Sequence, residues 1–201
     1  MATTPTLESL MSEGFTPRRK PILDHTAVIN NTIEWFQHKN QWQSVEIEMS
    51  LPQDKPSSII RRADIIAWNR NNREFYIIEA KAQWNDFVRD RKFFEYRKWC
   101  TWFAFAVPEE LAACARKRMD AVPGWYEGVG LLVIPNAFGS RRMVRRPTEN
   151  KMSRPMYTKM VEQWAASCRS RLVGERIKVG ELEYRLPRRQ VDEALRRAAR
   201  Q

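Results

Sequence analysis

The sequence predicts an α/β protein in which helices flank a mixed β-sheet, and three features carry this prediction. Residues 61–81 have the pattern of a β-hairpin, with apolar runs on both sides of residues 69–73 (NRNNR), because asparagine tolerates the positive φ of tight turns. Residues 101–107 are almost wholly apolar, which is typical of a strand buried on both faces. The helical pattern between these two segments predicts a right-handed crossover.

The remaining elements follow from the same periodicities. Asp24 is a suitable N-cap for a helix over 25–39, and residues 45–51 alternate apolar and polar side chains as one strand. A helix is expected from Asn85 or Asp86, either of which can cap it, to Trp99. A helix over 109–120, a strand over 128–134 and a basic edge strand over 141–146 complete the expected sheet.

Three segments are expected along the chain. Residues 1–20 have the composition of a flexible N-terminal arm, and residues 21–147 contain the α/β core. Residues 148–201 form a basic C-terminal α+β extension with a helix, a small hairpin around Gly180 and a last helix from Pro187. The first helix of this extension has an apolar stripe, so it packs either on the core or on a second copy, and the extension is therefore a candidate homodimer interface.

Positive charge is concentrated near the C-terminus. The net charge is +11, and residues 137–201 hold 17 Lys and Arg against 7 Asp and Glu. A polyanion such as DNA is the expected partner, and a solvated cationic surface is the alternative. The expected DNA-binding arginines of the last helix are Arg188, Arg189, Arg196 and Arg197.

Composition also bounds the compartment. The three cysteines, Cys100, Cys114 and Cys168, form no CxxC pair, which is typical of a reducing compartment. The sequence has neither an apolar stretch long enough to cross a bilayer nor a secretory signal. We therefore expect a cytoplasmic protein that does not insert into membranes.

The hairpin brings chemistry-bearing residues together. If its turn centres on Asn71 and Asn72, Asp64 lies opposite Glu79, and Lys81 emerges on the same face. Two close carboxylates repel each other unless a cation lies between them or one takes up a proton. A divalent cation such as Mg²⁺ or Mn²⁺ would bridge them, or Arg62 and Lys81 would neutralise them as a structural ion-pair cluster.

These residues also carry a resemblance to a known family. Asp64 and the run Glu79-Ala80-Lys81 resemble the PD-(D/E)xK nuclease signature, and residues 61–108, within a wider match over 24–146, resemble the MmcB-like family of DNA-repair endonucleases. The sequence departs from the family pattern at Ala63, where proline is common, at Phe93, where tryptophan is expected, and at residues 82–83.

The resemblance implies a restriction-endonuclease-like core and a metal-dependent endonuclease acting on DNA. Asp64 and Glu79, with the main-chain carbonyl of Ala80, are the implied ligands of Mg²⁺ or Mn²⁺, and Lys81 is the third catalytic residue. Glu48 and Glu34 are further candidate metal ligands, with surface glutamates as the alternative. Arg62, Lys92 and Tyr96 are the implied DNA contacts of the core. The alternative function is a nucleic-acid-binding protein that keeps the fold without catalysis.

Overall fold

The computed structural model describes residues 22–39, 42, 44–53, 60–136, 139–174, 177–179 and 182–184, with side chains described as far as Arg169. The arm expected over 1–20, the last helix expected from Pro187 and the four arginines expected on that helix lie outside the described residues. No helix among the described residues combines the length and the hydropathy needed to cross a membrane.

A mixed sheet of six strands forms the centre of the described structure, in the order β1-β2-β3-β4-β5-β6. Its strands are β1 (Ser44–Ser50), β2 (Arg62–Asn69), β3 (Glu74–Ala80), β4 (Trp102–Pro108), β5 (Gly130–Ile134) and β6 (Arg142–Arg145). The pairs β3–β4 and β4–β5 are parallel, and the other three pairs are antiparallel. The predicted α/β class and mixed sheet are confirmed.

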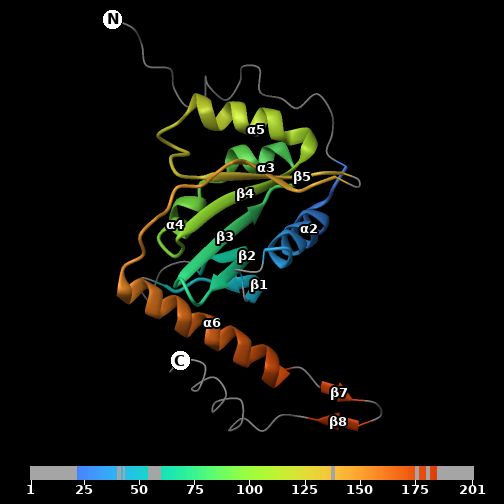
Figure 1. Cartoon of the computed structure of the whole chain (residues 1–201), viewed down its shortest axis with the longest axis vertical. Helices are drawn as coiled ribbons and strands as arrows, with labels where there is room; N and C mark the ends of the chain where they lie inside the picture. The colour runs from blue at the N-terminus through green and yellow to red at the C-terminus, as the bar shows by residue number, and fades with distance from the viewer. Residues whose placement is uncertain are drawn as a thin grey trace, which may run out of the picture.

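Helices cover both faces of this sheet (Figure 1). They are α2 (His25–Gln37), α3 (Trp84–Arg89), α4 (Phe93–Arg97), α5 (Glu109–Ala121) and α6 (Arg154–Gly174). Helix α2 packs through Val28, Ile29 and Phe36 on one face, while the larger apolar cluster on the other face gathers residues of α3, α4, α5 and α6. Asp24 caps α2 as predicted, since its Oδ1 accepts the Ala27 N–H over 2.7 Å.

The predicted β2–β3 hairpin is confirmed in its register. Ile65 pairs with Ile78 and Asn69 with Glu74, which leaves a four-residue loop that ends at Arg73. The φ of Arg73 is 57°, so this loop residue takes the left-handed conformation that returns the chain into β3. An even loop length keeps Asp64 and Glu79 on the same face of the sheet.

Strand β1 departs from its predicted simple alternation. Val45 packs with the α2 face, but Met49 and Leu51 join the opposite core cluster. The cause is Glu48, whose φ of 49° is left-handed. This single residue reverses the direction in which the following side chains point. The apolar residues of β1 therefore contribute to the cores on both faces of the sheet.

The expectation of one helix from residue 85 or 86 to 99 is wrong. The chain forms two short helices, α3 and α4, separated at Asp90, whose φ of −70° and ψ of 111° are extended. The predicted cap is also wrong, because Gln83 occupies the N-cap position without a side-chain hydrogen bond. The Asp90 side chain accepts the Lys92 N–H over 2.7 Å, a local bond that competes with continuing the helix.

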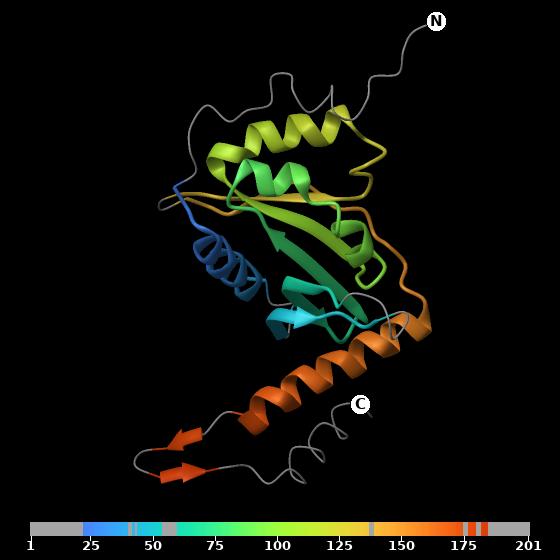
Figure 2. The same cartoon turned by 180° about the vertical axis from the view of Figure 1, so that it is seen from behind.

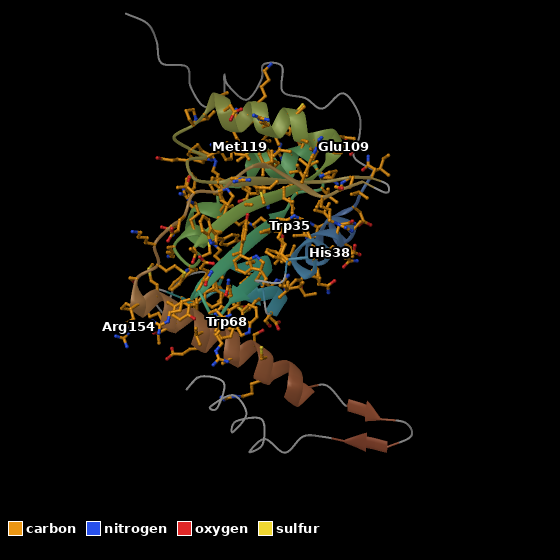
Figure 3. All side chains as sticks on the ribbon, in the orientation of Figure 1. Trp35, His38, Trp68, Glu109, Met119 and Arg154 are labelled. Atoms are coloured by element: carbon orange, nitrogen blue, oxygen red, sulfur yellow. The ribbon has the colours of Figure 1, made fainter. Side chains whose placement is uncertain are left out.

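Helix α6, the first helix of the basic extension, packs on the core. It runs past β1 in both views (Figure 2), and its Met160 and Trp164 are buried in the core. Trp68 of β2 lies beside this helix (Figure 3), with its indole N–H donating to the Tyr157 hydroxyl over 3.3 Å. The small hairpin expected after α6 is present as β7 (Ile177–Val179) and β8 (Leu182–Tyr184), and β7 pairs with β8 antiparallel.

Candidate active site

The candidate site lies where β2 begins and β3 ends. The strand ladder stops at the pair Ile65–Ile78, and beyond it the side chains of Asp64 and Glu79 replace the ladder carbonyls as acceptors. The Asp64 N–H donates to Oε1 of Glu79 over 3.0 Å, and the Ala80 N–H donates to Oδ2 of Asp64 over 2.9 Å. The hairpin therefore brings the two predicted acids together, each bonded to the main chain of the other strand.

Lys81 lies beside these acids. Its Nζ is 3.4 Å from Oε2 of Glu79 and 2.5 Å from Oδ2 of Asp90. Its main-chain N–H donates to the Ala106 carbonyl over 2.9 Å, which fixes the lysine backbone against β4. The Lys81 side chain is 12% exposed, the Glu79 side chain 5% and the Asp90 side chain 4%, so this ammonium is paired with two almost fully buried carboxylates.

Burial and mutual repulsion disfavour the charged form of the acids. Burial raises the pKa of Glu79 to about 8, and the neighbouring Asp64 adds to the shift while Lys81 opposes it. Burial also raises the pKa of Asp64, although the Ala80 N–H and Lys81 act in the other direction. Burial alone would lower the pKa of Lys81, but the Glu79 and Asp90 carboxylates raise it above its ordinary value. The lysine is therefore held in its charged form, whereas the charged forms of Asp64 and Glu79 are disfavoured even with Lys81 nearby.

This donor set fits a divalent cation. Asp64 and Glu79 offer carboxylate oxygens, and Mg²⁺ is usually bound by one or two carboxylates while it keeps several waters for exchange with phosphate oxygens. No group of three or more His, Cys, Asp or Glu side chains suited to a metal ion occurs in the part of the chain that the structure describes. A cation held by the two acids and the Ala80 carbonyl would complete its coordination with water or substrate oxygens.

The two further candidate ligands differ in position. Glu48 lies between residues paired with Ile65 and Ala63, which places it across from Asp64, and its carboxylate is 3.5 Å from the Arg62 guanidinium. Glu34 lies near the far end of α2 from His25 and is paired with Arg141. The structure thus places the Glu48 backbone opposite Asp64, with its carboxylate paired to Arg62, and holds Glu34 in a different ion pair.

The three predicted DNA contacts of the core differ in how exposed their side chains are. Arg62 has a side chain that is 62% exposed and pairs with Glu48. Lys92 is exposed at the start of α4. Tyr96 is buried, and its hydroxyl donates to the Arg62 carbonyl over 3.2 Å. Arg62 and Lys92 are thus available to a ligand, whereas Tyr96 supports the strand that carries Asp64.

Two residues at the site were missed by reasoning from sequence. Asp90 falls inside the single helix expected from Asn85 or Asp86 to Trp99, but it lies beside Lys81. His25, at the start of α2, has its Nε2 3.8 Å from Oδ1 of Asp64. A signal for Asp90 existed, because aspartate favours helix boundaries over helix interiors. The sequence held no comparable signal for His25, whose position depends on how α2 packs.

The fold and the site define an α/β protein whose mixed sheet carries two acids and a lysine at the end of an antiparallel strand pair. A solved structure of similar fold is the SPO1766 protein of unknown function from Silicibacter pomeroyi. It is 20% identical with a TM-score of 0.56, and the match covers 81% of this chain and 99% of that one. Comparison with curated proteins gave no match.

The family is identified from the sequence. The model of the family described as DNA repair protein MmcB-like matches residues 24–178, which is most of the chain. The chain therefore belongs to the MmcB-like family of DNA repair proteins. The resemblance drawn from residues 61–108 is confirmed, and the match includes the candidate site and α6 and ends within β7.

Proposed function

We propose that this protein is a metal-dependent endonuclease that hydrolyses DNA phosphodiester bonds in repair or processing, with a site of the PD-(D/E)xK type. The observation that carries the proposal is the convergence of Asp64, Glu79 and Lys81 at the end of the β2–β3 ladder. Glu79 is almost fully buried, and its pKa is raised to about 8. A bound cation would favour the charged form of this carboxylate.

Each residue has a distinct role in this proposal. Asp64 and Glu79, with the Ala80 carbonyl, would hold Mg²⁺ or Mn²⁺. Such a cation, when bound, polarises the scissile phosphate and lowers the pKa of a coordinated water. Lys81 stays charged beside Glu79 and would orient the attacking water or offset the charge that develops on the phosphoryl oxygens.

DNA is the favoured substrate for two reasons. The family is one of DNA repair proteins, and residues 137–201 carry 17 Lys and Arg against 7 Asp and Glu. Contacts with phosphates provide sequence-independent affinity. The exposed Arg62 and Lys92 lie close to the candidate site and would hold the backbone near the two acids.

Cleavage of labelled DNA tests the proposal. The full chain is incubated with duplex, single-stranded and branched DNA in the presence of Mg²⁺, Mn²⁺ or EDTA. We expect cleavage that requires the cation and is lost in Glu79→Gln, Asp64→Asn and Lys81→Met. Asp120→Asn is the matched control, because Asp120 forms an exposed pair with Arg116 on α5, and this variant should cleave like the wild type.

The alternative is a nucleic-acid-binding protein without catalysis, and one observation favours it. Lys81 already pairs with Glu79 and Asp90, which is the arrangement of a structural ion-pair cluster. Binding of DNA without cleavage under every cation, unchanged by Glu79→Gln, would support this alternative. The same assay with RNA decides between the two nucleic acids.

A further inference from the structure

Asp90 is held in place by both of its carboxylate oxygens. It is buried and lies in the break between α3 and α4. Its Oδ1 accepts the Lys92 N–H over 2.7 Å, and its Oδ2 lies 2.5 Å from the Lys81 ammonium. Because the first bond fixes the side chain to the backbone of the turn, the second oxygen has a defined position toward Lys81.

The Lys81 ammonium lies closer to Asp90 than to Glu79. The two distances are 2.5 Å and 3.4 Å, and the attraction between opposite charges falls as their separation grows. The same Nζ lies over the Phe105 ring, 5.9 Å from its centre. The lysine therefore has an anchor that does not depend on Glu79.

We propose that Asp90 is a positioning residue, which keeps the Lys81 ammonium from closing on Glu79 and so leaves the Glu79 carboxylate for a divalent cation. This inference rests on the proposed function, since it assigns a partner to the lysine of that site. Without Asp90, Lys81 has Glu79 as its nearest anion among the contacts described for it. The lysine would then compete directly with the cation for the same carboxylate.

A purely structural role for Asp90 makes a different prediction. If the pair served only to hold the break between α3 and α4, removing the carboxylate would change stability and leave cation affinity alone. If Asp90 acted only as a remote negative charge, its loss would weaken cation binding whether or not Lys81 were present. The proposed role requires that the effect of Asp90 disappear when Lys81 is removed.

A double-mutant cycle on Mn²⁺ affinity tests the proposal, with titration calorimetry of the full chain in the absence of DNA. Asp90→Asn keeps an oxygen for the Lys92 N–H and removes the anion. We expect it to weaken Mn²⁺ binding about 10- to 100-fold, as for other residues that orient metal ligands. Lys81→Met should bind Mn²⁺ at least as tightly as the wild type, and Asp90→Asn with Lys81→Met should match Lys81→Met alone.

Two further variants control for folding and for charge. Asp90→Ser retains an acceptor for the turn and should reproduce the effect of Asp90→Asn, so it replaces that variant if Asn does not fold by circular dichroism. Asp86→Asn removes an exposed acid of α3 and should leave Mn²⁺ affinity unchanged.

The outcomes separate this inference from the proposed function. Normal Mn²⁺ affinity in both Asp90 variants, or an equal loss with and without Lys81, overturns the positioning role and leaves the nuclease proposal standing. Absence of Mn²⁺ binding by the wild-type chain overturns the proposed function and the inference together.

Discussion

The Glu79 carboxylate accepts the main-chain N–H of Asp64 over 3.0 Å, so the two acids are joined across the strand pair. The Asp64 carboxylate accepts the Ala80 N–H over 2.9 Å in the same way. Buried N–H groups need acceptors, and here side chains provide them where the ladder of β2 and β3 stops. The acids are thus part of the sheet and are positioned by its register.

Stability should fall with rising pH because of Glu79. Its folded pKa of about 8 lies above the ordinary value of 4.5, so the folded chain binds more protons than the unfolded chain between these values. The contribution of Glu79 to stability is then full below pH 4.5 and is lost as pH rises through about 8. In EDTA, Glu79→Gln should gain stability relative to the wild type between pH 5 and 9, on the order of 2 to 5 kcal/mol.

Urea denaturation at pH 5, 7 and 9 measures this difference. Asp120→Asn, an exposed acid on α5, serves as the control and should follow the wild type. A constant difference between wild type and Glu79→Gln across this range would mean that the Glu79 carboxylate is ionised throughout.

Cation affinity should depend on pH in the opposite direction. A carboxylate must lose its proton to bind a metal ion, and the pKa of Glu79 is raised to about 8 in the absence of metal. The logarithm of the Mn²⁺ association constant should therefore rise by up to about one per pH unit below pH 8 and level off above it. Calorimetry between pH 6 and 9 measures it, and a flat profile would exclude Glu79 as a ligand.

Glu48 should be sensitive to the shape of its replacement. Its φ of 49° is tolerated by asparagine but disfavoured for β-branched residues. We expect Glu48→Asn to change the free energy of unfolding by less than about 1 kcal/mol, and Glu48→Val to cost about 1 to 3 kcal/mol. Ile47→Val, at the neighbouring position, should cost less than Glu48→Val in the same denaturation experiment, and equal costs would contradict the assigned backbone.

Much of the fold was predictable because local pattern and tertiary structure agree. The NRNNR loop and the two apolar runs around it predicted both the β2–β3 hairpin and a register that places Asp64 near Glu79. Asp24 and the apolar spacing of the following residues predicted α2. In these segments, side-chain periodicity indicates the structure that forms. The expected positive φ of an asparagine in the loop is not found among the described residues, because Arg73 takes the left-handed conformation instead.

Other features depend on contacts that distant residues make. The helix break at Asp90 is stabilised by Lys81, which precedes it by nine positions and belongs to the end of β3. The reversal in β1 depends on one left-handed residue, Glu48, which no glycine signals. The periodicity of each segment contains neither feature. The contact between Asp90 and Lys81 could not be predicted, because it forms only when two segments pack together.

The arginines beyond the described residues should contribute to DNA affinity through charge. Neutralising Arg188, Arg189, Arg196 and Arg197 to glutamine should reduce the slope of log K against log salt by about 3 to 4, if each contacts one phosphate. Fluorescence anisotropy with duplex DNA at several salt concentrations measures the slope. Neutralising Arg116 and Lys117 of α5 is the control, and an unchanged slope in the quadruple variant would remove these arginines from the interface.

The most direct measurement is a crystal structure of the chain with Mn²⁺, read from the anomalous signal of the metal. We expect a peak within coordination distance, on the order of 2 Å, of a carboxylate oxygen of both Asp64 and Glu79, with Lys81 still paired to Asp90. No peak at saturating Mn²⁺, with Lys81 bound between Glu79 and Asp90, would contradict the account.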